Sequence, residues 1–194
     1  ALATGLLTLH HITGSSEWLT SALGLLDVVL DHFADAETVG RWFDTADDAE
    51  ALVLRPSDPI DGATPSGASL IAEALQTAAH LAAEPERYAG AAAATLASAT
   101  PILARSPRSG GHWLAVAEAA VRGPLQIAVA CASPDSELLS AARRLAPGGT
   151  IVVGSGSVLL DGRAQVDGKD AAYVCRGSVC DLPVTTAGDL AKAL

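Results

Sequence analysis

The sequence is short of basic charge, long apolar runs and cysteine, and each shortage excludes a class of protein. It carries 12 Lys and Arg against 22 Asp and Glu, so its net charge is −10. An acidic chain repels nucleic acid and anionic membranes, and we expect neither as a partner. No apolar stretch approaches the roughly 18 residues of a transmembrane helix. Three cysteines are too few for a disulfide scaffold, which makes a reducing cytoplasm the expected location.

Methionine is absent altogether, including at position 1. The first apolar segment, residues 1–12, also has no Ser, Thr, Asp or Asn before it to begin a helix. Both features indicate a processed chain or a piece of a larger polypeptide. Leu2, Leu6 and Leu9 would then leave an apolar face that requires a companion segment or a second copy. The 49% hydrophobic content is high enough to predict a folded chain.

Helical periodicity dominates the N-terminal part, residues 1–122. The spacing of apolar residues predicts helices over 1–12, 17–33, 68–82, 85–104 and 112–122. The first two helices follow each other across a short turn and form a helical hairpin. Periodicity lapses in a block at 40–67. Within it, residues 49–54 are predicted as a short strand and residues 55–67, with three prolines, as an ordered loop.

Residues 123–194 change to a different pattern. Strand-like and helical runs alternate as strand, helix, strand, strand, helix over 125–131, 137–145, 150–153, 171–175 and 186–194. The first three runs make a βαβ unit, for which parallel pairing with a right-handed crossover is expected. Thr186 and Asp189 resemble a capping box for the last helix. The predicted fold class is therefore mainly α with a small α/β part.

Motifs for cofactors and metals fail on inspection. Gly154-Ser155-Gly156-Ser157 follows a strand but lacks the third glycine of a dinucleotide fingerprint, so a turn is the better interpretation. The acidic residues do not have EF-hand spacing, and none of the five histidines forms a zinc-protease motif. We therefore predict no cofactor and no metal site. One of the five histidines could still act as a general base, because catalytic histidines need not lie near one another in the sequence.

Cys175 and Cys180 enclose four residues. This spacing is not that of a C-x-x-C redox motif, and no second cysteine pair completes a zinc site. The favoured interpretation is two free thiols with structural roles in a reducing compartment. The alternative is a redox pair, since a hairpin could bring the two within disulfide distance.

Carboxylates concentrate in the block at 40–67. Asp44, Asp47 and Asp61 are the candidate catalytic residues, because paired carboxylates can perform acid–base chemistry on a sugar. The alternative is that these acids cap turns and helix starts. Prolines in the same stretch reduce the entropy lost on ordering, which favours a preformed binding surface. We expect the three carboxylates to converge with Trp42 on one concave surface.

Five blocks of sequence resemble a known family. They are WFDTADDAEAL at 42–52, RP at 55–56, DGATPSG at 61–67, AYVC at 172–175 and CDLPVT at 180–185. In this order and spacing, along nearly the whole chain, they resemble the spermatogenesis-associated protein 20 family. Its members have an N-terminal thioredoxin-like domain followed by an (α/α)6 toroid. The resemblance implies a C-terminal portion: helical hairpins of an incomplete toroid at 1–122 and a βαβ-containing tail at 123–194.

The resemblance also implies a function. In related six-hairpin folds, which include sugar epimerases and glycosidases, loops at one end of the toroid line a central pocket. By similarity, the ligand-binding residues would be Trp42, Asp44, Asp47, Asp61, Thr64 and Ser66. An indole beside hydroxyls and carboxylates is a suitable surface for a sugar. The chain would then contribute to a carbohydrate-binding or sugar-modifying pocket, epimerase-like or glycosidase-like, and would not act as an isolated fragment.

The alternative function is a non-catalytic scaffold or interaction domain that supports a thioredoxin-like redox module. The implied partners are a sugar ligand, the N-terminal remainder of the parent protein or a companion chain, and a second copy in a homo-oligomer. The block at 42–66 separates the two functions. Acids that face a cavity favour the sugar pocket, whereas acids that cap local turns favour the scaffold.

Overall fold

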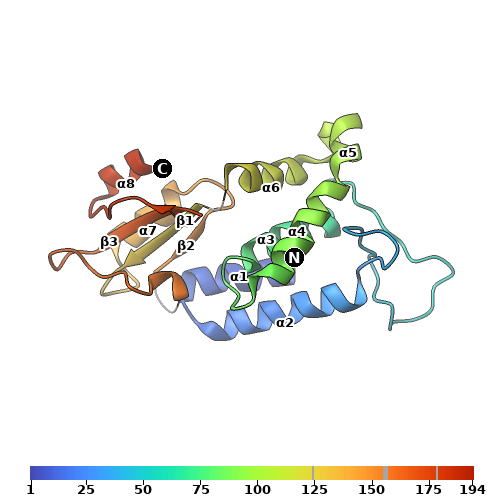
Figure 1. Ribbon diagram of the computed structural model, residues 1–194, viewed down its shortest axis with the longest axis horizontal. Coiled ribbons are helices and arrows are strands. Elements are labelled where there is room, and N and C mark those ends of the chain that lie inside the picture. Colours follow the sequence, from blue (N-terminus) through green and yellow to red (C-terminus); the bar gives the residue numbers. More distant parts are fainter. Residues whose placement is uncertain (124, 155–156, 178) are drawn as a thin grey trace. The chain divides into compact units, whose positions relative to one another are not determined.

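The structure, a computed structural model, divides into two compact units (Figure 1). It describes residues 1–123, 125–154, 157–177 and 179–194. The helical unit comprises residues 1–7 and 20–118, and the sheet unit comprises residues 8–19 and 119–194. The chain is mainly helical with a small mixed four-stranded sheet, in agreement with the predicted fold class at that level. Part of the predicted Gly154–Ser157 turn, Ser155 and Gly156, lies outside the described residues.

Most predicted helices form with small shifts at their ends. They are α1 (Leu2–Thr13), α2 (Ser16–His32), α3 (Gly67–Ala78), α4 (Pro85–Ser98), α5 (Thr100–Arg105) and α6 (Gly111–Arg122). The prediction of one helix over 85–104 is wrong, because α4 ends at Ser98 and α5 begins at Thr100. Pro101 explains the break, since proline is tolerated in the first turn of a helix and disrupts a helix interior.

The core of the helical unit lies around Trp113. Its fully buried indole packs with Ala72, Ala99 and Val116. Figure 1 shows α3 and α4 side by side, and these two helices share the most extensive contact of this unit. Alanines such as Ala72 and Ala92 face the interior, where small side chains let the helices approach closely.

The segment that joins α2 to α3 contains no helix or strand. The strand predicted at 49–54 is wrong, because all of these residues are described and none pairs with a neighbouring strand. Val53 and Leu54 lie exposed instead. An apolar run without a sheet edge beside it cannot satisfy its backbone groups as a strand. The loop predicted at 55–67 is confirmed up to the start of α3.

The sheet unit has the strand order β2-β1-β3-β4. The strands are β1 (Leu125–Ala130), β2 (Ile151–Val153), β3 (Ala171–Arg176) and β4 (Val179–Cys180). β1 and β2 run parallel, as the βαβ pattern predicts, while β3 is antiparallel to both β1 and β4. α7 (Glu137–Leu145) contacts β1, β2 and β3, and α8 (Ala187–Ala193) packs on α7. The core between them is apolar and includes Ile127, Val129, Leu139, Val174 and Leu190.

Residues 8–19 belong to the sheet unit, and Arg143 of α7 forms hydrogen bonds with them. Its guanidinium donates to the carbonyl oxygens of Ile12 (2.8 Å) and His11 (3.2 Å). These carbonyls end α1, where a cation is electrostatically favourable. Within the described part of the chain, no helix has the length and apolar character needed to cross a bilayer.

Candidate functional site

Asp61 is the most heavily bonded carboxylate of the predicted site. Its Oδ1 accepts from the backbone amide of Ser66 (2.9 Å) and the hydroxyl of Ser69 (2.8 Å). Its Oδ2 accepts from the backbone amides of His112 (2.8 Å) and Trp113 (3.2 Å). These donors lie at the starts of α3 and α6, where backbone amides have no partner within the helix. One side chain therefore caps two helices that are distant in sequence.

The surroundings of Asp61 also set its charge. Burial acts to raise the pKa of this carboxyl group, but the hydrogen bonds from Ser66, Ser69, Trp113 and His112 outweigh it and hold the pKa below 3.8. A carboxylate with a lowered pKa cannot serve as a general acid near neutral pH, which requires a raised pKa. The electrostatics of Asp61 are those of a helix cap.

The loop around Asp61 makes two further hydrogen bonds, one to α6 and one to the 3-10 turn that precedes it, Pro107–Ser109. The indole nitrogen of Trp113 donates to the carbonyl oxygen of Pro59 (2.7 Å), and the backbone amide of Asp61 donates to the carbonyl of Ser109 (2.9 Å). Because the Trp113 side chain is fully buried, its indole N–H would be costly to leave unpaired. The loop thus completes the hydrogen bonding of a core residue.

Ser66 and Thr64 have backbone roles in the same loop. Ser66 is the N-cap of α3, and its hydroxyl oxygen accepts from the backbone amide of Ser69 (3.1 Å). Thr64 is exposed, and its carbonyl oxygen accepts from the amide of Gly62 (3.0 Å) to close a turn. The predicted ligand-binding hydroxyl of Ser66 is therefore engaged in capping.

Trp42 is a buried residue and not an exposed aromatic face. Its side chain is 6% exposed, and its indole nitrogen donates to the Thr95 hydroxyl of α4 (3.0 Å). The Ser57 hydroxyl donates to the Trp42 carbonyl (2.7 Å). Stacking on a sugar requires an accessible ring face. Trp42 instead anchors its loop to α4.

Asp44 and Asp47 have separate partners. Asp44 Oδ2 accepts from the backbone amide of Asp58 (3.1 Å), which holds two stretches of the loop together. Asp47 Oδ1 lies 2.8 Å from His32 Nδ1 at the end of α2. Both acids are exposed. Each of these side chains has its own hydrogen-bond partner, and the expected convergence of Asp44, Asp47 and Asp61 with Trp42 on one concave surface stays a prediction.

A cavity of about 350 Å³ does lie beside this loop. Of the described residues that line it, none is Asp or Glu, and Trp42 is the only one from the predicted ligand set. Its lining consists of Thr38, Gly40, Arg41, Trp42, Ser57, Pro59, Ala68, Ser98 and Ile102. Acid–base chemistry on a sugar needs carboxylates in reach of the glycosidic bond. The cavity can hold a small molecule but does not supply that chemistry.

His32, Asp47 and Asp48 place their potential ligand atoms within 4.8 Å of one another. Structural zinc has four ligands, one more than this group offers. Arg55 adds positive charge to the same turn, since its guanidinium donates to the carbonyls of Thr45 (2.6 Å) and His32 (3.1 Å). A nearby cation opposes binding of a second one. The geometry is that of an ion pair at the end of α2.

This ion pair makes a prediction about pH. The hydrogen bond to Asp47, followed by the charges of the nearby carboxylates, raises the pKa of His32 above 6.5. Stability from a raised histidine pKa is complete below 6.5 and is lost as the pH rises through the folded-state value. Asp47→Asn should return the NMR titration midpoint of His32 toward 6.5, whereas the control Glu50→Gln should leave it raised. Equal midpoints in the two variants would refute the pairing.

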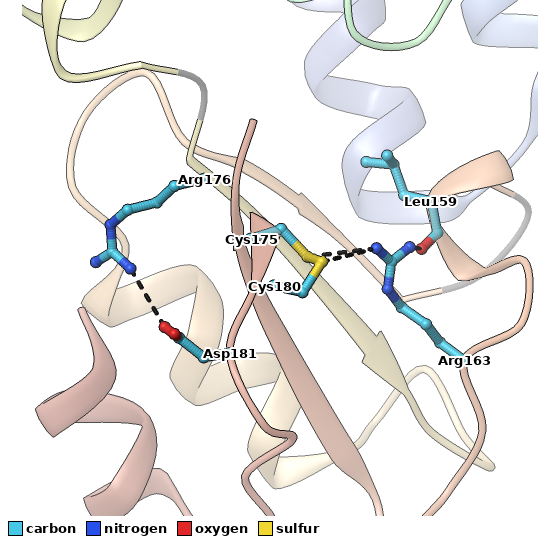
Figure 2. Close-up of a disulfide and its surroundings, with 6 residues drawn as sticks. All are labelled: Leu159, Arg163, Cys175, Arg176, Cys180 and Asp181. Carbon is cyan, nitrogen blue, oxygen red and sulfur yellow. Dashed lines mark hydrogen bonds and ion pairs between the residues drawn. A yellow bond between two sulfur atoms is a disulfide. The ribbon is translucent and has the colours of Figure 1, made fainter. Parts of the chain in front are cut away.

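Cys175 and Cys180 form a disulfide between β3 and β4, so the prediction of two free thiols is wrong (Figure 2). The two residues are direct partners in the strand register. The terminal nitrogen Nη2 of Arg163 lies 3.3 Å from the Cys175 sulfur and 3.2 Å from the Cys180 sulfur. Cys131, the remaining cysteine, is a free thiol.

Three residues that organise these regions were absent from the predicted site: Arg55, Trp113 and Arg163. Arg55 stacks its guanidinium 4.1 Å from the centre of the Phe43 ring while bonding the end of α2. Phe43 and Arg55 lie in the same loop of the sequence. An arginine and an aromatic residue this close in sequence are a weak signal for such stacking. Trp113 and Arg163 act through partners whose positions depend on the tertiary fold.

Comparisons of the sequence with protein-family models and with curated proteins find no match.

Proposed function

We propose that this chain is a non-catalytic scaffold or interaction domain. The capping of both α3 and α6 by Asp61 carries this proposal, because it engages the central candidate acid in structural hydrogen bonds. The pairing of Asp47 with His32 and of Asp44 with the Asp58 amide supports it in the same way. A loop built from such contacts stabilises a surface and leaves little polar chemistry for a substrate.

A more specific proposal is that this chain is part of a larger protein. The helical unit would supply the closing hairpins of an (α/α)6 toroid in the C-terminal portion of a spermatogenesis-associated protein 20-like protein. The packed α3–α4 pair suits such an architecture. Its role would be to support a thioredoxin-like redox module in the cytoplasm. Fold analogy gives the architecture, while the function rests on the residues described above.

An apolar groove provides the surface for interaction. It has a volume of about 260 Å³ and lies within the helical unit between α1, α2 and α3. The described residues that line it are all of apolar type: Ala1, Leu2, Ala3, Leu25, Leu26, Val28, Val29, Phe33, Leu70, Ile71 and Ala74. Contiguous apolar surface of this kind marks an interaction site. We assign it to an apolar helix of the companion toroid segment, and a second copy can take that place when the chain is alone.

Sedimentation velocity tests this assignment. The isolated chain should self-associate as its concentration is raised, and Val28→Glu should weaken that association about tenfold or more, because an unpaired charge would be buried. Val28 is 48% exposed, so the substitution should not disturb folding. The matched control Val53→Glu lies in the exposed loop and should change nothing. A monomer at every concentration with low binding of a hydrophobic dye would contradict the assignment.

The carbohydrate function remains the second proposal, and one observation favours it. The cavity beside Trp42 has hydroxyl and guanidinium groups from Ser57, Ser98 and Arg41 on its walls, which are suitable partners for sugar hydroxyls. Under this proposal a sugar would bind without the help of Asp61. Saturable binding of a sugar at this cavity, unchanged in Asp61→Ala, would favour it over the scaffold.

A further inference from the structure

The disulfide of the sheet unit joins a buried sulfur to an exposed one. Cys175 on β3 is 1% exposed, whereas Cys180 lies exposed on β4 at the edge of the sheet. A reagent from solvent therefore has access to Cys180 and not to Cys175. Nucleophilic attack on a disulfide depends on which sulfur can be reached.

The hairpin that carries the disulfide is also held by other contacts. The backbone amide of Asp181 donates to the carbonyl of Val174 (2.9 Å), and Ala172 and Val184 exchange two backbone hydrogen bonds (2.8 and 3.0 Å). Arg176 and Asp181 add an ion pair at 3.4 Å. Because the disulfide spans only five positions in sequence, it removes little chain entropy from the unfolded state. The paired strands do not depend on the disulfide for their register.

Arg163 places a cation against both sulfur atoms. Figure 2 shows its guanidinium approaching the disulfide from one side, while the Arg176–Asp181 pair lies on the other. Nη2 donates to both sulfurs, and the other terminal nitrogen donates to the Leu159 carbonyl, which fixes the orientation of the group. A neutral disulfide gains little from a neighbouring cation, whereas a thiolate gains much. The position of Arg163 therefore favours the products of reduction.

We propose that Cys175 and Cys180 form a thiol–disulfide exchange site that accepts two electrons from a dithiol, with Arg163 stabilising the thiolate that leaves. One thiolate of the dithiol attacks Cys180 Sγ and forms a mixed disulfide. The bond between the cysteines breaks, and its electron pair passes to Cys175 Sγ beside Arg163. The second thiol of the dithiol then loses its proton to solvent. The resulting thiolate attacks the first sulfur of the same dithiol, which is bonded to Cys180 Sγ in the mixed disulfide. Cys180 leaves as a thiolate, and the dithiol is released as a disulfide.

The reduced site would keep its geometry. Directly paired residues of antiparallel strands hold their Cβ atoms about 5 Å apart, so two thiols at these positions stay in reach of each other. Reoxidation by an external disulfide then begins with a mixed disulfide on Cys180 and ends when the Cys175 thiolate attacks Cys180 Sγ, which releases the external partner as a thiol; this last step is intramolecular and has a high effective concentration. A reversible site of this kind goes beyond the scaffold function and does not depend on it, because it uses only residues of the sheet unit.

The test measures how fast dithiothreitol reduces the native protein at pH 7. Acid quenching, followed by alkylation in denaturant and mass measurement, should count one thiol before reduction and three after it, since Cys131 is free throughout. Arg163→Gln should slow reduction about tenfold, the effect of losing one stabilising charge beside a leaving thiolate. The matched control Arg176→Gln, on the other side of the hairpin, should stay within about twofold of the wild type.

Two further measurements keep the proposal open to refutation if Arg163→Gln folds poorly. Arg163→Lys keeps the charge and should retain a rate within about threefold of the wild type. Peptide mapping of the adduct formed with the monothiol glutathione should find it on Cys180. The proposal is overturned if Arg163 and Arg176 variants are reduced at equal rates, if the adduct is on Cys175, or if reduction requires denaturant.

Discussion

Asp61→Ala should lower the free energy of unfolding of the helical unit by about 3 kcal/mol, since two helix caps and hydrogen bonds to a charged group are lost together. The amides of Ser66, His112 and Trp113 would lose their acceptor, and the hydroxyl of Ser69 would keep only the Ser66 carbonyl (3.1 Å). Water replaces part of this bonding because the site is half-buried. Urea denaturation followed by tryptophan fluorescence and circular dichroism measures the change.

Asp58→Ala is the matched control for this loss. Asp58 lies in the same loop, and its side chain accepts one local hydrogen bond, from the backbone amide of Ile60 (3.0 Å). Its removal should cost less than about 1 kcal/mol. Equal losses in the two variants would mean that the loop responds to any change of charge, and the specific capping by Asp61 would be refuted.

The same residue gives the stability a pH dependence. Because the folded-state pKa of Asp61 lies below 3.8, its contribution is complete above that value and is lost as the pH falls through the folded-state pKa. The difference in stability between wild type and Asp61→Ala should therefore be constant near neutral pH and shrink in acid. A difference that grows as the pH falls would contradict the lowered pKa.

Gly40→Ala should destabilise the helical unit by about 3 kcal/mol, because it combines a left-handed backbone with a steric clash. Gly40 has a φ of +82°, and a Cβ atom there would lie 2.2 Å from the carbonyl oxygen of Ala94. The backbone of α4 cannot yield to such a contact without moving Thr95, which accepts from Trp42. The melting temperature measures the loss.

Gly62→Ala provides the comparison for Gly40. A Cβ atom at Gly62 would meet nothing within 4 Å, and its backbone is not in the left-handed region. The melting temperature of Gly62→Ala should stay close to that of the wild type. If both variants melted alike, the close approach of the loop to α4 would not exist in solution.

Local patterns were sufficient to predict much of the fold. Apolar spacing located the helices, and the strand–helix–strand order predicted the parallel pairing of β1 with β2. The capping role of Thr186 also followed from sequence, and its hydroxyl accepts from the Asp189 amide (3.1 Å). In each case the interacting residues are close in sequence or follow a general rule of chain connection.

The candidate site was less predictable because its contacts are distant in sequence. Asp61 reaches amides near residue 112, and nothing in the loop sequence encodes that meeting. A tryptophan among acids suits both a sugar surface and a buried anchor, and Trp42 is the anchor. The Cys175–Cys180 disulfide depended on β4, a two-residue strand too short to show an alternating pattern.

Amide hydrogen exchange at the start of α6 tests most directly whether the loop is a structural cap. The scaffold account predicts that the amides of His112 and Trp113 are protected in the wild type and exchange about a hundredfold faster in Asp61→Ala, the change that corresponds to about 3 kcal/mol. Amides later in α6 should be affected less. If the His112 and Trp113 amides stay equally protected in the variant, Asp61 does not hold this helix, and its carboxylate is available for a ligand.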